Sequence, residues 1–189
     1  GVLRKDDGIK ALVEDARAEA WGQDGSCPLQ LVIKHWSTPE PTSGYRFVRS
    51  AFWRTGKTVI EGLQGSNFDP DRWVSHLTWS NLYKVALSAS DGRKAGNPGA
   101  PLQRAQRDAC IKLLRQELQQ FKPKRVLFLT GQDWADPFLQ EPEVDNWSSS
   151  KTELVQSFGK LKVGDRMVDF VVAKHPQGKP ETKLACQVL

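Results

Sequence analysis

Residues 51–58, AFWRTGKT, differ from the phosphate-binding pattern G-x-x-x-x-G-K-[ST] only by an alanine in place of the first glycine. Such a loop needs small residues, so that successive backbone N–H groups converge on the phosphates, and it must connect a strand to a helix. Here Phe52, Trp53 and Arg54 fill the interior with bulky side chains, and the preceding residues favour a helix. We therefore expect no nucleoside triphosphate to bind, and we expect Lys57 to be an ordinary surface charge.

Polar loops that could carry chemistry follow four short apolar runs. The runs are typical of strands, and they are residues 29–33, 77–87, 125–131 and the stretch that begins at Met167. Histidine, asparagine, glutamate and lysine side chains gather in the loops, which are residues 35–43, 81–97, 131–136 and 174–183. Imidazole and amide groups donate and accept hydrogen bonds, as the recognition of a small polar ligand requires.

Helical segments separate these runs. Apolar residues at helical spacing predict helices over residues 9–21, 45–63 and 102–121, the last being the clearest. Strands that alternate with helices favour an α/β fold with a parallel sheet covered on both sides. Because the working site of such a sheet lies beyond the carboxyl ends of its strands, we expect the four polar loops to meet there.

The amino-acid composition limits the number of domains and the kinds of partner that the chain can have. The 189 residues, 39% of them hydrophobic, predict one domain over residues 1–189. A net charge of +5 favours an anionic partner. Three dispersed cysteines indicate neither a disulfide framework nor a zinc site, so we expect a cytoplasmic protein without a metal. No apolar run approaches the ~18 residues of a membrane span, and we expect no membrane partner.

Together, several of these segments resemble the uracil-DNA glycosylase superfamily. The resemblance covers residues 79–180, and a weaker similarity extends over residues 29–54. The segments that carry it are WSNLYKVA, GNP, a helix with Cys110 and LLRQEL, FKPKRVLFLTG and VVAKHPQGKP. It implies a three-layer α/β/α domain with a central four-stranded, mainly parallel sheet. It also implies a monomer that flips a base out of DNA and hydrolyses its N-glycosidic bond without a metal or cofactor.

The resemblance assigns roles to two residues. Asn81 matches the asparagine whose amide reads the edge of the flipped pyrimidine; the alternative is that Asn81 caps a strand or loop. His175 matches the histidine that stabilises the departing base, on which negative charge develops; the alternative is a histidine satisfied by the backbone at the end of a strand. Residues 177–183 match the loop that enters the minor groove, although Gln177, Gly178, Lys179 and Pro180 stand where a bulky apolar wedge is typical.

The first motif of the superfamily is altered in this chain. Members follow their first strand with a residue that positions the attacking water, whereas here residues 34–40 read KHWSTPE. Glu40, His35 or the backbone could hold the water, and a carboxylate is the better electrostatic partner for a cationic sugar. Aromatic residues of this region are candidates for stacking on the base, with core packing as the alternative: Phe52, Trp53 and Trp36.

Basic residues near the predicted site are candidates for phosphate contacts, and solvated surface charges are the alternative. The candidate DNA-binding set is Lys84, Arg93, Lys94, Lys174, Gln177, Lys179 and Lys183.

These features predict a monofunctional DNA glycosylase. The rebuilt first motif favours a modified pyrimidine as the excised base, with a role in defence against phages with modified DNA or in base-excision repair. A uracil-specific glycosylase and a catalytically inactive DNA- or base-binding protein are the alternatives. A hydrolase of the nucleophile-elbow type is disfavoured because the chain lacks that motif.

Overall fold

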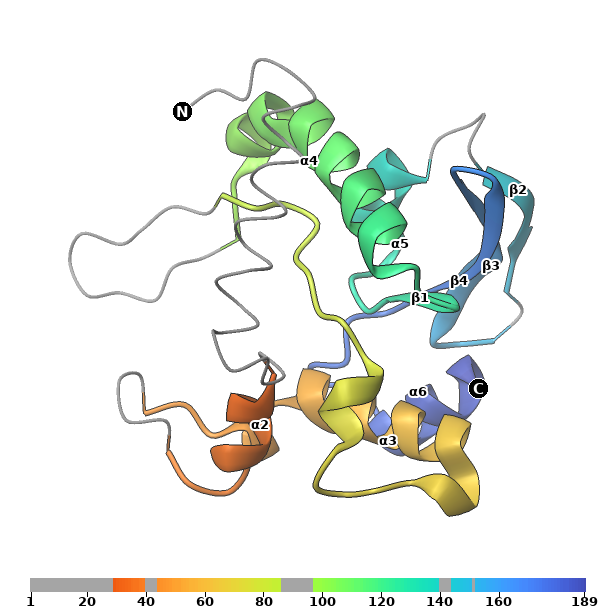
Figure 1. Ribbon diagram of the computed structural model, residues 1–189. Coiled ribbons are helices and arrows are strands. Elements are labelled where there is room, and N and C mark those ends of the chain that lie inside the picture. The colour runs from red at the N-terminus through yellow and green to blue at the C-terminus, as the bar shows by residue number, and fades with distance from the viewer. Residues whose placement is uncertain (1–28, 40–43, 86–96, 140–143, 151) are drawn as a thin grey trace.

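The computed structural model describes residues 29–39, 44–85, 97–139, 144–150 and 152–189 (Figure 1). The predicted helix over residues 9–21 lies outside these ranges, as do Glu40, Arg93 and Lys94.

One four-stranded sheet is present in the described residues. Its strands are β1 (Arg125–Phe128), β2 (Val144–Ser149), β3 (Val155–Val163) and β4 (Arg166–Ala173), in the order β1-β4-β3-β2. Only β1 and β4 are parallel neighbours, because β3 pairs antiparallel with both β4 and β2. The predicted three-layer domain with a central, mainly parallel sheet is therefore wrong: the sheet is mixed and mainly antiparallel. The later two predicted strands are confirmed as β1 and β4, and the described residues of the first two do not form strands.

Residues 29–33 were expected to be a strand but lead into the helix α2 (Gln30–Lys34). A short apolar run fits a buried strand and a buried helix equally well. The outcome is decided by spacing, because Leu29, Val32, Ile33 and Trp36 recur at helical intervals and pack into one apolar cluster.

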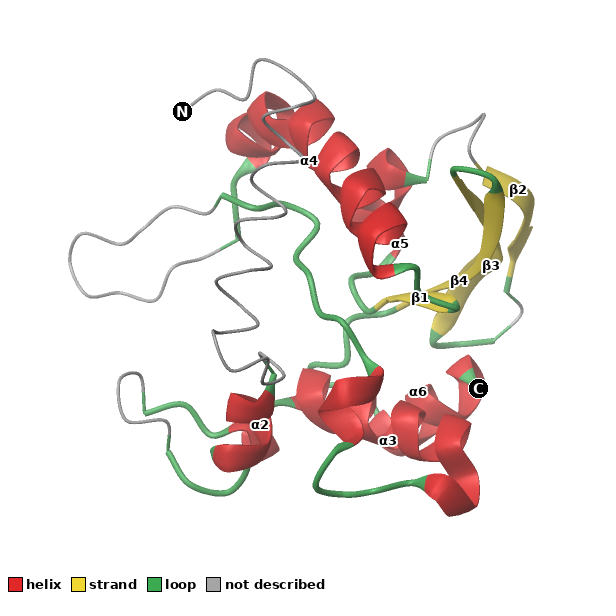
Figure 2. Ribbon diagram, viewed as in Figure 1, coloured by secondary structure: helices red, strands yellow, loops and turns green. Residues whose placement is uncertain are grey.

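Residues 77–85, the described part of the second predicted strand, have no regular structure (Figure 2). Trp79 packs on Trp53, and Tyr83 packs on Trp134 and Phe138. The Gln106 side chain replaces a strand partner, since its amide accepts from the Val85 N–H at 2.9 Å and donates to the Val85 carbonyl at 2.8 Å. The backbone polar groups of Val85 are thus satisfied without a ladder.

The helix α4 (Ala100–Phe121) confirms the predicted helix over residues 102–121 and covers one face of the sheet. Its buried residues Cys110, Leu114 and Leu118 pack in one cluster with Val168 and Phe170 of β4. Period-two alternation in β4 sends these residues to the α4 face and the residues between them to the other face.

The second face of the sheet is covered at one end by α6 (Glu181–Val188). Leu184 of α6 packs in a cluster with Ala173 of β4 and Leu129, and α6 in turn packs along α3 (Ala51–Gln64). Residues 51–58 therefore form helix and not a phosphate-binding loop. The helix predicted over residues 45–63 is confirmed for its larger part, with the short helix η1 (Phe47–Arg49) before it.

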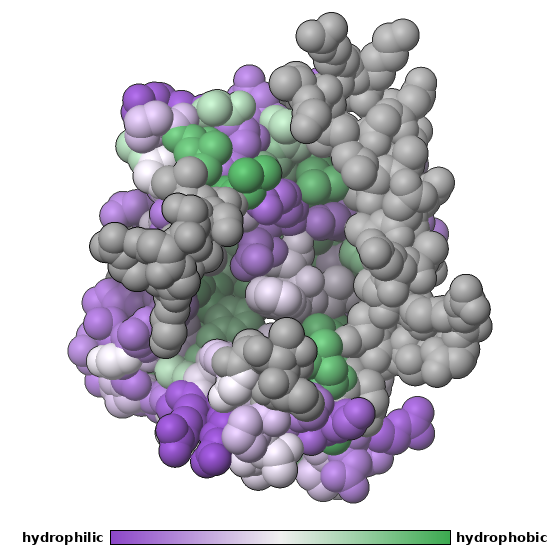
Figure 3. All heavy atoms as spheres, turned by 90° about the vertical axis from the view of Figure 1, so that its left-hand side faces the viewer, coloured by the Kyte–Doolittle hydropathy of each residue, from purple (hydrophilic) through white to green (hydrophobic). Residues whose placement is uncertain are grey.

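Short elements complete the fold. Two of them follow α3, namely η2 (Gly65–Asn67) and η3 (Trp73–His76). Two follow β1, namely α5 (Gln132–Ala135) and η4 (Asp136–Phe138). In Figure 1, α4 and the sheet lie above α2, α3 and α6. The face between these two groups is hollowed, and hydrophobic side chains are visible in the hollow (Figure 3).

Gly159 on β3 marks a close approach in the core. A Cβ atom there would lie 3.0 Å from the Phe170 ring and 3.1 Å from the Asp145 carbonyl oxygen. Gly159→Ala should therefore lower the free energy of unfolding by about 1–3 kcal/mol, as overpacking does. Gly56→Ala is the control, because nothing lies within 4 Å of its Cβ position in α3. That substitution should instead stabilise the helix by up to ~1 kcal/mol. Urea unfolding measures both, and equal stability of the two variants would contradict this packing.

Candidate functional site

An open cavity of about 350 Å³ lies where the parallel strands β1 and β4 end. The turn after β1 with the start of α5, the loop after β4 and one residue of β3 line it. The lining residues are Thr130, Gly131, Gln132, Asp133, Trp134, Gln156, Lys174, His175, Gln177 and Lys179. The position agrees with the expectation that the site lies beyond the carboxyl ends of strands.

The first wall of the cavity follows β1. Gly131 has a φ of 84°, which allows the chain to turn sharply from the strand into α5. Its N–H donates to the Ala173 carbonyl at 2.9 Å, so the turn stays joined to the end of β4. The residues after this turn, Gln132 to Trp134, therefore face the loop that follows β4.

Hydrogen bonds hold two amide side chains of this wall. The Gln132 N–H donates to Gln156 Oε1 at 3.0 Å, and the Gln132 amide accepts from the buried Ser157 hydroxyl at 2.6 Å and donates to Asp136. Both the oxygen and the nitrogen of the Gln132 amide are thus engaged. Gln156 uses only its oxygen, which leaves its amide N–H₂ group as a donor beside the cavity.

Asp133 is the one carboxylate among the lining residues of this cavity. Its side chain is exposed, and among the described residues it has no hydrogen-bond or ion-pair partner. An unengaged carboxylate can accept hydrogen bonds from a water molecule and can stabilise a nearby positive charge.

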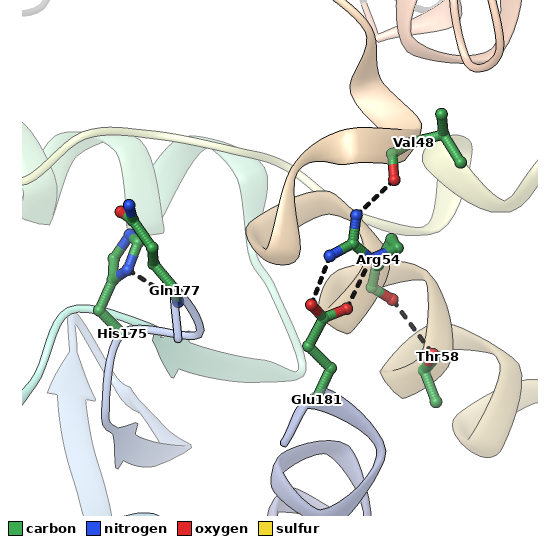
Figure 4. A network of polar contacts seen from close by, with 6 residues as sticks. All are labelled: Val48, Arg54, Thr58, His175, Gln177 and Glu181. Carbon is green, nitrogen blue, oxygen red and sulfur yellow. Dashed lines mark hydrogen bonds and ion pairs between the residues drawn. The ribbon is translucent and has the colours of Figure 1, made fainter. Parts of the chain in front are cut away.

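His175 forms the opposite wall, on the loop between β4 and α6 (Figure 4). Its Nδ1 accepts a hydrogen bond from the Gln177 N–H at 3.2 Å. The side chain lies at the exposed rim, yet partial burial lowers the pKa of the imidazole below its ordinary value of 6.5. At neutral pH the ring is therefore mostly uncharged, and because Nδ1 accepts, its proton lies on Nε2. Nε2 can donate to a ligand.

The predicted basic residues fall into two groups. Lys174 and Lys179 line the cavity and have no ion-pair partner among the described residues. Lys183 pairs with Glu153 at 2.5 Å, and this hydrogen bond lowers the pKa of the Glu153 carboxyl. Lys84 pairs with Glu117 at 2.9 Å. The charges of Lys174 and Lys179 also lower the pKa of the Glu153 carboxyl, but neither lysine forms an ion pair among the described residues, so these two are the better candidates for contacts with an anion.

Asn81 is exposed and does not line the cavity. It lies two residues before Tyr83, whose ring packs 5.4 Å from that of Trp134 on the cavity wall. Its assignment as the reader of a base edge stays a prediction.

The remaining predicted residues lie in the apolar cluster around α2 and α3, away from the cavity lining. Trp53 is 7% exposed and packs against Phe47, Phe52 and Trp79. Trp36 packs edge-on against Trp73, with the ring centroids 5.7 Å apart. Lys57 Nζ lies 5.9 Å from the Trp36 ring centroid, so it is partly engaged with aromatic faces.

His35 lies at the end of α2, outside the cavity lining. Its Nδ1 is buried and has no hydrogen-bond partner among the described residues.

Of the site residues predicted from the sequence, four lie together at the cavity: His175, Gln177, Lys174 and Lys179. The sequence reasoning missed Asp133, Gln132 and Gln156. The loop over residues 131–136 was itself expected at the site, so Asp133 could have been named from its position after β1, whereas nothing marked Gln156.

Two further findings concern the described part of the chain. No group of three or more histidine, cysteine, aspartate or glutamate side chains there could hold a metal ion. No described helix has both the length and the apolar character needed to cross a bilayer.

Comparisons with protein-family models, with curated proteins and with solved structures found no match for this chain.

Proposed function

We propose that this chain is a monofunctional DNA glycosylase whose active site is the cavity at the ends of β1 and β4. One observation carries the proposal: a neutral imidazole that can donate from Nε2 lies in the same cavity as an unengaged carboxylate and two unpaired lysines. A hydrogen-bond donor to the departing base, a carboxylate beside the sugar and cations for the phosphates all serve base excision. The proposal rests on this site and not on the expected parallel sheet, which is absent.

The chemistry divides between the two walls. The bond between C1′ of the sugar and the base nitrogen breaks, and its electron pair leaves with the base. His175 Nε2 donates a hydrogen bond to the base as negative charge develops on it. Asp133 stabilises the cationic sugar and orients a water molecule, whose oxygen bonds to C1′ while its proton passes to the carboxylate.

The two unpaired lysines support a DNA partner. In this account Lys174 and Lys179 contact phosphates on either side of the flipped nucleotide. Flipping gives the enzyme access to a base that is otherwise stacked in the duplex.

Replacing both lysines by alanine should weaken binding to duplex DNA with little dependence on its sequence. The slope of log K against log salt should fall in magnitude by roughly 0.9 for each phosphate that the variant no longer neutralises. Fluorescence anisotropy over a salt series measures this slope. Lys160→Ala is the control, because Lys160 pairs with Asp169 at 2.6 Å on β3 and β4. An unchanged slope in the double variant would remove the lysines from the DNA-binding surface.

The base itself is proposed to be a modified pyrimidine, with phage defence or base-excision repair as the setting. The cavity is open to solvent, and the N–H₂ group of the Gln156 amide, which lines it, can donate to a carbonyl group of the base. An open site accommodates a base that carries an additional group more readily than a closed one does.

A panel of duplexes tests both the activity and the base. Each duplex contains uracil, thymine, a modified cytosine or a modified thymine at one position, and alkali converts abasic sites into strand breaks. We expect cleavage at a modified pyrimidine. Cleavage at uracil alone would establish the uracil-specific alternative and remove the modified-base proposal.

A catalytically inactive binding protein is the second candidate, and the position of Asn81 outside the cavity lining favours it. Such a protein would retain affinity for DNA that contains the target base and would produce no abasic sites. The duplex panel, read by anisotropy as well as by cleavage, separates the two functions.

A further inference from the structure

Arg54, one of the residues that excludes a phosphate-binding loop at residues 51–58, connects α3 to α6 (Figure 4). Its guanidinium donates to both carboxylate oxygens of Glu181, with Nε at 2.7 Å from Oε2 and Nη2 at 2.5 Å from Oε1. The third nitrogen, Nη1, donates to the Val48 carbonyl at 2.5 Å. A planar guanidinium with two parallel bonds to one carboxylate fixes the direction of both side chains.

Glu181 is the first residue of α6, so this pair lies where the loop that carries His175 ends. The loop has seven residues, 174–180, between Ala173 of β4 and Glu181. At its other end the Lys174 N–H donates to the Leu154 carbonyl at 2.9 Å. The loop is therefore fixed to the sheet at one end and to α3 at the other.

Inside the loop the hydrogen bonds are local. The Lys179 N–H donates to the Pro176 carbonyl at 2.9 Å, and the Gln177 N–H donates to His175 Nδ1. Gly178 has a φ of 71°. Because this local turn includes the imidazole itself, a shift of α6 relative to α3 would displace His175 and disrupt its hydrogen bond with the Gln177 N–H.

We propose that Arg54 and Glu181 are a positioning pair, which holds the 174–180 loop so that His175 Nε2 is directed at the ligand in the cavity. This inference rests on the proposed function for its kinetic consequence only. Neither residue lines the cavity, and both act through the loop.

Because the pair is partly exposed, breaking it should affect the position of His175 more than the stability of the fold. The side chains of Arg54 and Glu181 are 38% and 26% exposed, so solvent screens their attraction. Breaking the pair should lower the Tm by no more than about 4 °C, which is small for a chain of this size. A displacement of a catalytic group by about 1 Å, in contrast, can reduce a rate by about 10²-fold.

The kinetic test uses Arg54→Gln, Glu181→Gln and Arg54→Lys. The two glutamine variants should lower kcat by roughly 10-fold and change KM by less than about 3-fold, because the alignment of His175 is impaired and the lysines still bind DNA. Arg54→Lys keeps an ion pair without the parallel bonds and should have a smaller effect. Asp169→Asn is the control, since it breaks an exposed ion pair with Lys160 and should leave kcat unchanged. A kcat of Arg54→Gln equal to that of the wild type would overturn the proposal.

A spectroscopic test does not depend on the activity. NMR of ¹⁵N-labelled histidines reports the tautomer of His175, and His175→Gln assigns its signals. We expect Arg54→Gln to shift the His175 nitrogens away from the Nε2-protonated form as the hydrogen bond from the Gln177 N–H breaks, while the signals of His76 stay in place. Unshifted His175 signals in a folded variant would overturn the positioning role.

The kinetic test and the NMR test can fail independently of each other. If the wild type excises no base, the proposed function fails and the NMR result alone decides the positioning pair. If Arg54→Gln does not fold, Glu181→Gln and Arg54→Lys provide the same comparison.

Discussion

His175→Ala should reduce the single-turnover rate of abasic-site formation by about 10²–10³-fold, the cost of removing one preorganised donor to a developing negative charge. The imidazole can donate to this charge at neutral pH, because Nδ1 accepts from Gln177 and the proton lies on Nε2. DNA binding should change little, since the lysines of the cavity remain.

The matched control is His76→Ala, which removes an exposed histidine from η3. It should leave the rate within about 2-fold of the wild type, because surface substitutions away from special features have small effects. A His175→Ala variant with wild-type rate and normal folding would remove the imidazole from the mechanism.

The pH dependence of the same rate has a definite sign. Partial burial lowers the pKa of His175, so the neutral imidazole persists below pH 6.5. If the neutral ring is the active form, the rate stays level through pH 6.5 and falls only as the pH drops through the lowered pKa. The unfolded chain binds this proton more readily, so the contribution of His175 to folding stability is also lost as the pH falls. A rate that rises on acidification would instead require a charged imidazole.

Asp133→Asn should reduce the same rate by about 10²-fold, because an amide neither takes up a proton from water nor stabilises a cationic sugar. The fold should be unaffected, since the Asp133 carboxylate has no hydrogen-bond or ion-pair partner among the described residues. Loss of activity without loss of stability is thus the specific expectation.

Asp71→Asn provides the control for charge, because Asp71 is an exposed acid in the turn before η3. Thermal unfolding monitors the stability of both variants. Should Asp133→Asn retain full activity, the water-positioning role would pass to a residue outside the cavity lining, and Glu40 would again be the first candidate.

The fold was predictable where local pattern and tertiary packing agree. The 102–121 helix has an apolar face that meets the sheet. The apolar residues of β1 and β4 were recognisable because residues on both faces, such as Phe170 and Val171, pack in apolar clusters. In residues 29–36 the run was too short for its period to be read, and the helical spacing became visible only with Trp36 included. In residues 77–85, the Gln106 amide satisfied the backbone of Val85, which no local pattern could indicate.

The antiparallel hairpin of β3 and β4 explains the error in sheet type. Residues 155–163 alternate between the two faces of the sheet, and Gly164 has a φ of 60° in the two-residue turn that follows. Both the alternation and the turn glycine are visible in the sequence.

The site was predictable only where the strands were predicted correctly. Two of the four polar loops follow β1 and β4 and meet, whereas the other two follow described segments that are not strands.

Mass spectrometry of the released product tests most directly whether the cavity at the ends of β1 and β4 excises a base. Wild-type protein incubated with a duplex that contains the target base should release the free base and leave one abasic site per base, with the backbone intact. The His175→Ala variant should release almost none. Release of no base from any duplex of the panel, or equal release by the two proteins, would contradict the account.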